Sequence, residues 1–178
     1  MSAPTYNADF TRAMDLLMKL EGGYADLAGD PGGATKCGIT DLMWQSWRTS
    51  YGLSPKPLQA ATEDDVWAFY WDMYWCPFHC QGVPWPLSAV YLQCAVNLDP
   101  GSAIKCLQIG VMARPVDGIF GPETQHRASV MPLNHAILQL LAAQSAFYAF
   151  HPERYESGLQ DRVTAVYKWW RVLPRPPV

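Results

Sequence analysis

KLEGGYADLAGDPGGATKCGIT, at residues 19–40, decides the fold of the N-terminal part, because it joins a helical pattern to a run of turn-forming residues. Before Glu21, apolar side chains recur at helical spacing, at Phe10, Ala13, Met14, Leu17 and Leu20. Glu21 lies four positions after Leu17, so it belongs to the same helical face as these apolar residues. Gly22 and Gly23 follow at once, as glycines do at helix C-termini. The stretch therefore predicts a helix that ends on a carboxylate.

Turn-forming residues and short β-type segments follow this helix. DPGG at 30–33 is a turn signal and TKCGIT at 35–40 suits a short strand, so we expect a small β-hairpin near residues 24–40. The remaining pattern is mainly helical. Expected helix starts are an N-cap at Asn7 or Asp9, an N-cap at Thr40 or Asp41, a capping box of Thr62 and Asp65, an N-cap at Ser102 and a first-turn proline at Pro122. Further helices are expected at 87–96 and 133–150, followed by a last, interrupted helix to Trp170. Behind the capping box, an apolar stripe is predicted at Val66, Phe69, Tyr70, Met73 and Tyr74. The predicted fold class is therefore mainly α.

The composition favours a packed protein and argues against several partners. Hydrophobic residues make up 49% of the 178 residues and charged residues 16%, which suits one domain or two small ones. No apolar run reaches the roughly 18 residues of a membrane span, and the N-terminus has neither the basic start nor the apolar core of a signal peptide. The net charge of −3, without a cluster of Lys and Arg, argues against a nucleic-acid partner.

Five cysteines stand at irregular spacing, at Cys37, Cys76, Cys80, Cys94 and Cys106. Their odd number favours reduced thiols that are mostly buried as small hydrophobic side chains. CPFHC at 76–80 lacks a second ligand pair at zinc-like spacing, and the four histidines are scattered, so we expect no metal ion and no organic cofactor. Eight tryptophans and nine tyrosines supply core residues and also suit the flat faces of carbohydrates.

A carboxylate at the end of an apolar helical face is expected to have a raised pKa, because burial and the negative end of the helix both disfavour its charge. Glu21 is therefore a candidate general acid, although a glutamate that only hydrogen-bonds to loop amides would occupy the same position. Asp30 follows nine positions later, and Thr35 five positions after that. A hairpin folded over the helix end would bring together an acid, a second carboxylate and a water-holding hydroxyl, a minimal set for glycoside hydrolysis. Taken alone, Asp30 is also a common turn residue.

The segment LEGGYADLAGDPGGATKCGIT at 20–40 resembles the N-terminal signature of glycoside hydrolase family 108, the N-acetylmuramidases of phages and bacteria. Further segments similar to those of the family are DMYW at 72–75, CAVNLDPGSAIKCLQ at 94–108, VDGIFGPET at 116–124 and GLQDRV at 158–163. The resemblance thus covers nearly the whole chain. It implies a lysozyme-like helical fold with the small β-hairpin near residues 24–40.

The resemblance also implies a division of the chain. A muramidase catalytic region is expected at 1–95, and a helical region resembling a peptidoglycan-binding domain at 96–178, the two packed as one compact unit. VDGIFGPET, at 116–124, is interpreted mainly as a turn and helix start that complete the helical core, with a contribution to the substrate groove as a second hypothesis.

The family's catalytic acid is the glutamate of its Glu-Gly-Gly-Tyr motif, which the resemblance places at Glu21. The arrangement also resembles the Glu/Asp/Thr set of phage-type lysozymes, which would make Asp30 the second carboxylate and Thr35 the hydroxyl that positions water. Thr35 stands one residue closer to the glutamate than in those enzymes, so Asp26 and Asp41 remain alternatives to Asp30. The residues of matched segments expected to bind the glycan are Tyr24, Trp75 and Asn97.

The implied activity is hydrolysis of the β-1,4 bond between N-acetylmuramic acid and N-acetylglucosamine in peptidoglycan. A lytic transglycosylase acting on the same bond and a peptidoglycan-binding module without activity are the alternatives. The additional aspartate and threonine favour the reaction that uses water. The glycan strands are the expected partner of a monomer, with no nucleic acid and no membrane span. An endolysin of this type is made in the host cytoplasm and acts on the cell wall after release through a holin or a dedicated export route.

Overall fold

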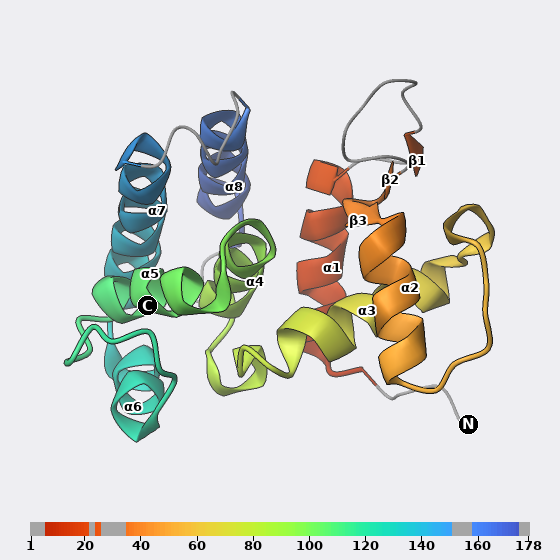
Figure 1. Ribbon diagram of the computed structural model, residues 1–178. Coiled ribbons are helices and arrows are strands. Elements are labelled where there is room, and N and C mark those ends of the chain that lie inside the picture. The colour runs from red at the N-terminus through yellow and green to blue at the C-terminus, as the bar shows by residue number, and fades with distance from the viewer. Residues whose placement is uncertain (1–5, 22–23, 26–34, 151–157, 175–178) are drawn as a thin grey trace. The chain divides into compact units, whose positions relative to one another are not determined.

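The computed structural model describes residues 6–21, 24–25, 35–150 and 158–174, and of Glu21, Tyr24 and Ala25 it describes the backbone. The fold is mainly helical with a small antiparallel sheet, which confirms the predicted lysozyme-like class (Figure 1). The chain divides into two compact units, Met1–Pro77 and Phe78–Val178. The division expected at residue 95 falls inside a helix of the second unit, Leu87–Asn97.

The first unit places its sheet between its first two helices in the chain order. Its elements are α1 (Ala8–Glu21), β1 (Tyr24–Ala25), β2 (Thr35–Lys36), β3 (Ile39–Thr40), α2 (Asp41–Ser50), the 3-10 turn η1 (Leu58–Ala60), α3 (Glu63–Tyr70) and the π turn η2 (Trp71–Trp75). The backbone N–H of Phe10 donates to Asn7 Oδ1 at 2.7 Å, so Asn7 caps α1 as one of the two predicted residues. Helix α1 ends at Glu21, as the sequence predicts.

The sheet has three antiparallel strands in the order β1-β2-β3, one strand more than the predicted hairpin. The turn between β2 and β3 is Cys37-Gly38, and both residues have positive φ, 51° and 78°, as a two-residue hairpin turn requires. Thr40 ends β3 and also caps α2, because its hydroxyl accepts the backbone N–H of Met43 at 3.3 Å. The sheet therefore continues directly into a helix, at the end of the unit where α1 stops (Figure 1).

The predicted apolar stripe of α3 is confirmed up to Tyr70, where the α-helix gives way to a π turn. The capping box of Thr62 and Asp65 is present, and Val66 and Phe69 are buried as predicted. Beyond Tyr70 the chain forms one π turn, whose wider repeat shifts each later side chain relative to an α-helix. Met73 is consequently 37% exposed, while Trp75 is completely buried in its place. The predicted stripe is wrong in this last turn.

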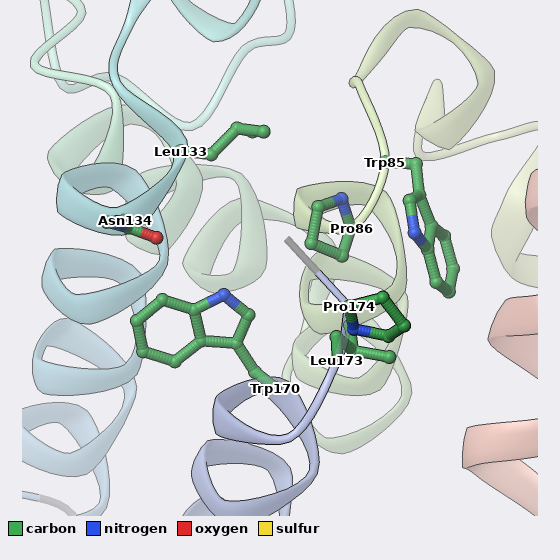
Figure 2. Close-up of a pocket in the computed structure, with 7 residues that line it drawn as sticks. All are labelled: Trp85, Pro86, Leu133, Asn134, Trp170, Leu173 and Pro174. Carbon is green, nitrogen blue, oxygen red and sulfur yellow. The ribbon is translucent and has the colours of Figure 1, made fainter. Parts of the chain in front are cut away.

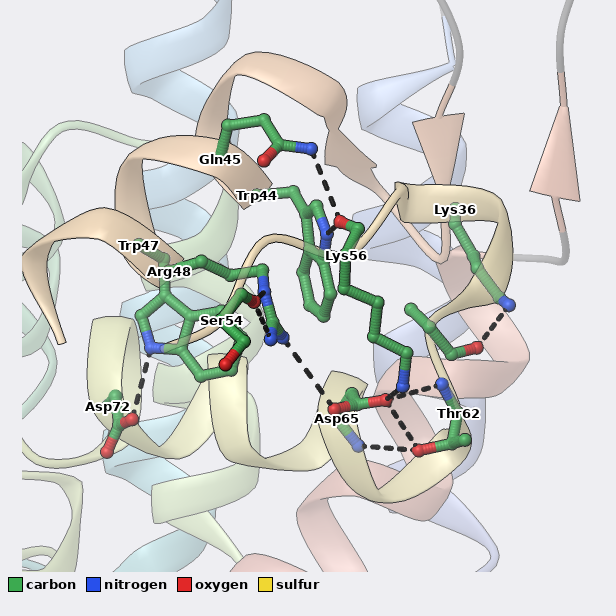
Figure 3. A network of polar contacts seen from close by, with 11 residues as sticks. Lys36, Trp44, Gln45, Trp47, Arg48, Ser54, Lys56, Thr62, Asp65 and Asp72 are labelled. Atoms are coloured by element: carbon green, nitrogen blue, oxygen red, sulfur yellow. Dashed lines mark hydrogen bonds and ion pairs between the residues drawn. The ribbon is translucent and has the colours of Figure 1, made fainter. Parts of the chain in front are cut away.

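A polar network closes the connection between α2 and α3 (Figure 3). Asp65 accepts hydrogen bonds from Lys56 Nζ and from the Thr62 backbone N–H, the latter at 2.7 Å. The Arg48 guanidinium lies 3.9 Å from the same carboxylate and donates to the carbonyl of Ser54. Burial acts to raise the pKa of Asp65, but the hydrogen bonds and the charge of Lys56 outweigh it, so the pKa lies below its usual value.

The second unit is built around its longest helix. Its elements are η3 (Cys80–Gly82), α4 (Leu87–Asn97), α5 (Pro100–Gly110), α6 (Pro122–Val130), α7 (Leu133–Phe150) and α8 (Leu159–Arg171). Helix α7 packs against α4, α5 and α8. Gly110 lets α5 approach α7 closely, because a Cβ there would stand 2.9 Å from the Ala136 carbonyl oxygen. Residues 151–157, between α7 and α8 in the chain, lie outside the described residues.

The start of α5 differs from the prediction by its cap. Asp99 is the N-cap, and its carboxylate accepts the backbone N–H of Ser102 at 3.1 Å. Ser102 is therefore the donor of the capping bond, and the prediction that it caps the helix is wrong. Pro100 directly after the cap takes a first-turn position, where the missing N–H costs no hydrogen bond.

Gln108 joins the loop at 116–124 to α5. Its side chain donates to Asp117 Oδ1 at 2.8 Å and accepts the backbone N–H of Gly118 at 2.9 Å. Gly118 has φ +81°, and a Cβ on it would stand 2.9 Å from the carbonyl oxygen of Gly101. Pro122 begins α6 as predicted. These contacts support the interpretation of the loop as a part that completes the helical core.

All five cysteines are free thiols. Three of them, Cys80, Cys94 and Cys106, are buried in the second unit, in agreement with the prediction. Burial raises the pKa of the Cys94 thiol well above its usual value, and contact with the Cys106 thiol adds to the effect. Among the helices described, none combines the length and the apolar character that a membrane crossing needs.

Candidate active site

Glu21 is the last residue of α1, on the helical face whose other members are Phe10, Met14 and Leu17. These three side chains are at most 1% exposed, so this face is the one that α1 turns to the core of the unit. The candidate acid thus continues an apolar stripe at the C-terminal end of a buried helix face. Its side chain lies outside the described residues.

The candidate second carboxylates differ in what the structure describes of them. Asp30 and the alternative Asp26 both lie outside the described residues. Asp41 is the first residue of α2 and is exposed, and its carboxylate accepts a hydrogen bond from Gln45 Nε2 at 3.4 Å. Asp41 therefore stands directly behind β3, in the sheet region that follows α1.

Strand pairing places Tyr24 and Thr35 in the same small sheet. Ala25 pairs with Thr35 and Tyr24 with Lys36, while Thr35 also pairs with Thr40 on the other side. Thr35 therefore occupies the central strand and is partly exposed. Because β1 begins three residues after Glu21, this sheet starts immediately beyond the end of α1.

The two faces of the sheet have different surroundings. Lys36 and Ile39 are paired residues and so point to the same face, where Ile39 is completely buried. Thr35 and Thr40 point to the opposite face, because successive side chains of a strand alternate. The hydroxyl of Thr35 thus lies on the face that is turned away from the packed side.

Trp75 and Asn97 do not join this sheet. Trp75 is completely buried, and its ring lies 5.3 Å from that of Phe10, which leaves no surface of the indole for a glycan. Asn97 ends α4 in the second unit, where its Nδ2 donates to the Gln93 carbonyl at 2.7 Å and its Oδ1 accepts from Arg162 at 3.0 Å. Asn97 and Arg162 come from two of the segments that carry the family resemblance, and they hold α4 to α8.

Asp72 is a half-buried carboxylate that no motif in the sequence marks as a site residue. Burial raises its pKa above the usual value, and the hydrogen bond from Trp47 Nε1 at 3.1 Å acts in the opposite direction. The neighbouring Trp71 packs on Tyr6, just before α1, with ring centroids 5.3 Å apart. Asp72 is thus near the start of α1, and Glu21 ends that helix about 20 Å further along its axis. It is not a carboxylate partner for Glu21.

The second unit contains a pocket between the N-terminal end of α7 and the C-terminal end of α8, beside the start of α4 (Figure 2). Its lining consists of Trp85, Pro86, Leu133, Asn134, Trp170, Leu173 and Pro174. Among the described residues that line the pocket, Asn134 carries a polar amide and none carries a charge. Such a surface suits a neutral ligand with apolar faces. Over the described residues, no group of three His, Cys, Asp or Glu side chains is arranged to hold a metal ion.

Residues 14–98 match the family model described as glycosyl hydrolase 108. Among solved structures, the chain is similar to that of Brucella abortus SagA, with a TM-score of 0.71 and 27% identity over 90% of this chain and 92% of that chain. No curated protein matches the chain. The matched residues contain Glu21 and the whole sheet, and they extend through α4. The family match supports the interpretation of this chain as a glycoside hydrolase.

Proposed function

We propose, from the match of residues 14–98 to glycosyl hydrolase 108, that the protein hydrolyses peptidoglycan at the β-1,4 bond between N-acetylmuramic acid and N-acetylglucosamine. The observation that carries the proposal is that the matched region contains a buried helix face that ends on Glu21. The protein would act on the cell wall after release through a holin or a dedicated export route.

Glu21 is the general acid of the proposed reaction. Its position on an apolar face and at a helix C-terminus favours the protonated carboxyl, which donates its proton to the glycosidic oxygen as the bond to the muramic acid carbon breaks. The sugar cation that forms is stabilised by a second carboxylate, Asp30 in the first instance and Asp26 or Asp41 as alternatives. Water held by the Thr35 hydroxyl then adds to the muramic acid carbon and gives one proton back to the Glu21 carboxylate.

A lytic transglycosylase on the same bond is the alternative chemistry. In that reaction a hydroxyl of the muramic acid itself attacks, and an anhydro sugar forms without water. The partly exposed Thr35, on the sheet face away from the packed side, supports the water-using reaction. The two reactions leave different sugar ends, so their products distinguish them.

Glu21→Gln tests the proposal directly. We expect the wild type to release reducing muramic acid ends from purified peptidoglycan, and the variant to lose about a hundredfold to ten-thousandfold in rate, because the amide cannot donate the proton. Mass spectrometry of the digests reads the products. Asp15→Asn is the matched control, since Asp15 is an exposed carboxylate on the same helix and its variant should keep full activity.

Three results would count against this assignment. Anhydro sugar ends from the wild type would assign the transglycosylase reaction, and released peptides would assign a different bond. A Glu21→Gln variant as active as the wild type would remove Glu21 from the reaction. Replacement of Asp26, Asp30 and Asp41 by Asn, one at a time, identifies the second carboxylate by the largest loss.

The pocket of the second unit supports a second candidate function, binding of the glycan strand. Trp85 and Trp170 offer indole surface, and Asn134 offers an amide that can pair with the acetamido group of an amino sugar (Figure 2). The described lining residues are uncharged, which agrees with a neutral N-acetylglucosamine ring as the occupant.

A further inference from the structure

Lys36 makes an unusual contact for a strand residue next to a candidate site. Its ammonium donates to the backbone carbonyls of Gln59, at 3.2 Å, and Ala61. Gln59 belongs to the 3-10 turn η1, and Ala61 is the C-cap residue of this turn, so both carbonyls stand at its C-terminal end. A cation at this place satisfies two backbone acceptors at once, so the contact fixes β2 to a segment more than twenty residues away in the chain.

Tyr70 holds Cys37, the turn residue that directly follows β2. Its hydroxyl donates to the carbonyl of Cys37 at 2.6 Å, and its side chain is only 1% exposed within the core. Two consecutive residues, Lys36 and Cys37, are thus held by different parts of the helical framework, η1 and α3. The end of β2 and its turn therefore have little freedom to move relative to that framework.

These anchors act on the inner face of the sheet, and Thr35 stands on the other face. Lys36 shares its face with the buried Ile39, whereas Thr35 pairs with Thr40. Thr40 uses its hydroxyl to cap α2, so its position is set by that helix. The position of the Thr35 hydroxyl follows instead from the backbone of β2, which Lys36 holds one residue away.

We infer that Lys36 is a positioning residue for Thr35 in the proposed hydrolysis, with Tyr70 as the second anchor of the same strand. The inference rests on the proposed function. Lys36 touches no substrate in this scheme, because its ammonium is engaged with the carbonyls of η1. It acts by keeping the Thr35 hydroxyl where it orients water. A displacement of about 1 Å in such a group lowers the rate by up to about a hundredfold.

A double-mutant cycle tests the inference. We expect Lys36→Met to lower kcat by about ten- to a hundredfold with KM nearly unchanged, and Thr35→Val, which keeps the shape but removes the hydroxyl, to do the same. The double variant should be no slower than Thr35→Val alone, because Lys36 acts through that hydroxyl. Rates are measured on soluble glycan strands prepared from peptidoglycan.

Two further variants separate positioning from a general effect on folding. Lys36→Arg should recover most of the lost rate, since a guanidinium can also donate to both carbonyls. Tyr70→Phe, which removes only the hydroxyl, should lower kcat in the same way as Lys36→Met. Lys168→Met, at an exposed lysine of the second unit, is the control that should leave the rate unchanged.

Several outcomes would overturn the inference. Losses that multiply in the double variant, or a Lys36→Met variant as fast as the wild type, would show that Lys36 does not act through Thr35. If Glu21→Gln abolishes activity but Thr35→Val does not change it, the inference fails while the proposed function stands. If the wild type released no sugar ends, both the proposed hydrolysis and the positioning role of Lys36 would be wrong.

Discussion

Asp65 joins three parts of the first unit through one carboxylate. It completes the capping box of α3 with Thr62, pairs with Lys56 and lies near Arg48 of α2. The capping box was predictable because its two residues stand three positions apart in the sequence. The two cations were not, because they come from the preceding helix and loop and reach Asp65 only after the chain has folded (Figure 3).

The lowered pKa of Asp65 predicts how this network responds to acid. The folded pKa lies below the unfolded value, so the carboxylate stabilises the fold above about pH 4 and loses this contribution as the pH falls through the folded pKa. We expect Asp65→Asn to lower the free energy of unfolding by about 2 kcal/mol at neutral pH, because it removes a charged hydrogen-bond acceptor. Urea unfolding at several pH values measures this difference.

The difference between Asp65→Asn and the wild type should shrink steadily below about pH 4. Asp64→Asn is the control, since Asp64 is an exposed neighbour in the same first turn and lacks the partners of Asp65. A constant difference between the wild type and Asp65→Asn across the whole pH range would contradict the assignment of the effect to this charge.

Asp72 illustrates what the sequence conceals at the scale of one residue. The carboxylate follows a tryptophan in a pattern that suits an exposed helix position. Its partner Trp47 is 25 residues away, and its burial depends on the π turn that begins at Trp71. Neither feature leaves a local signal, so a raised pKa at this position becomes evident only in the folded chain.

At the scale of elements, the sequence predicts best where a local signal is complete. The start of α3, the proline at the start of α6 and the end of α1 at Glu21 each have their cause within a few residues. The cap of α5 was assigned to Ser102 because Asp99, three residues earlier, was interpreted as part of a turn. The strands were predicted from TKCGIT, whereas β1 is only two residues long and depends on its pairing with β2.

The loop between α5 and α6 gives a prediction at this scale. Gly118→Ala should lower the free energy of unfolding by about 2 kcal/mol, because the residue has positive φ and its Cβ would press on the Gly101 carbonyl. Thermal unfolding of the full chain measures the change. Gly121→Ala is the matched control in the same loop, since Gly121 has an extended backbone with φ −123° and open space around its Cβ position.

We expect Gly121→Ala to lower the unfolding temperature by clearly less than Gly118→Ala does, because its only cost is the weaker capping of α6 by Ala than by Gly. If Gly118→Ala and Gly121→Ala lowered the unfolding temperature equally, the loss would not come from the close approach of Gly118 to Gly101. The hydrogen bond from Gly118 to Gln108 would then not depend on the conformation of the glycine.

At the scale of the whole molecule, the first compact unit and the region that matches the family model end at different residues. The first unit ends at Pro77, whereas the match continues to Leu98 and takes in α4 of the second unit. The sequence could not reveal this, because no linker composition marks residue 77. The candidate site was predictable in part. Motif and helix spacing predicted that α1 ends at Glu21 and that Thr35 lies in a strand, whereas the burial of Trp75 follows from the π turn.

The pocket of the second unit predicts wall binding that is separable from cleavage. In a Glu21→Gln background, Trp85→Ala and Asn134→Ala should each lower binding to purified peptidoglycan by about tenfold, because each would remove one of the contacts proposed to hold a sugar ring in the pocket. Sedimentation of the protein with insoluble peptidoglycan measures the bound fraction. Gln139→Ala, at an exposed position of the same helix α7, is the control. Unchanged binding in both pocket variants would exclude the pocket as the glycan site.

The π turn at Trp71–Trp75 also gives the first unit one spare residue. In an ordinary α-helix, deletion of a residue rotates everything beyond it by about 100° and removes the following side chains from the core. Here, loss of the exposed Met73 would convert the π turn into an α turn and bring Tyr74 and Trp75 into the positions that continue the stripe of Val66, Phe69 and Tyr70. This is therefore a place where the chain can change its length by one residue and keep its aromatic core.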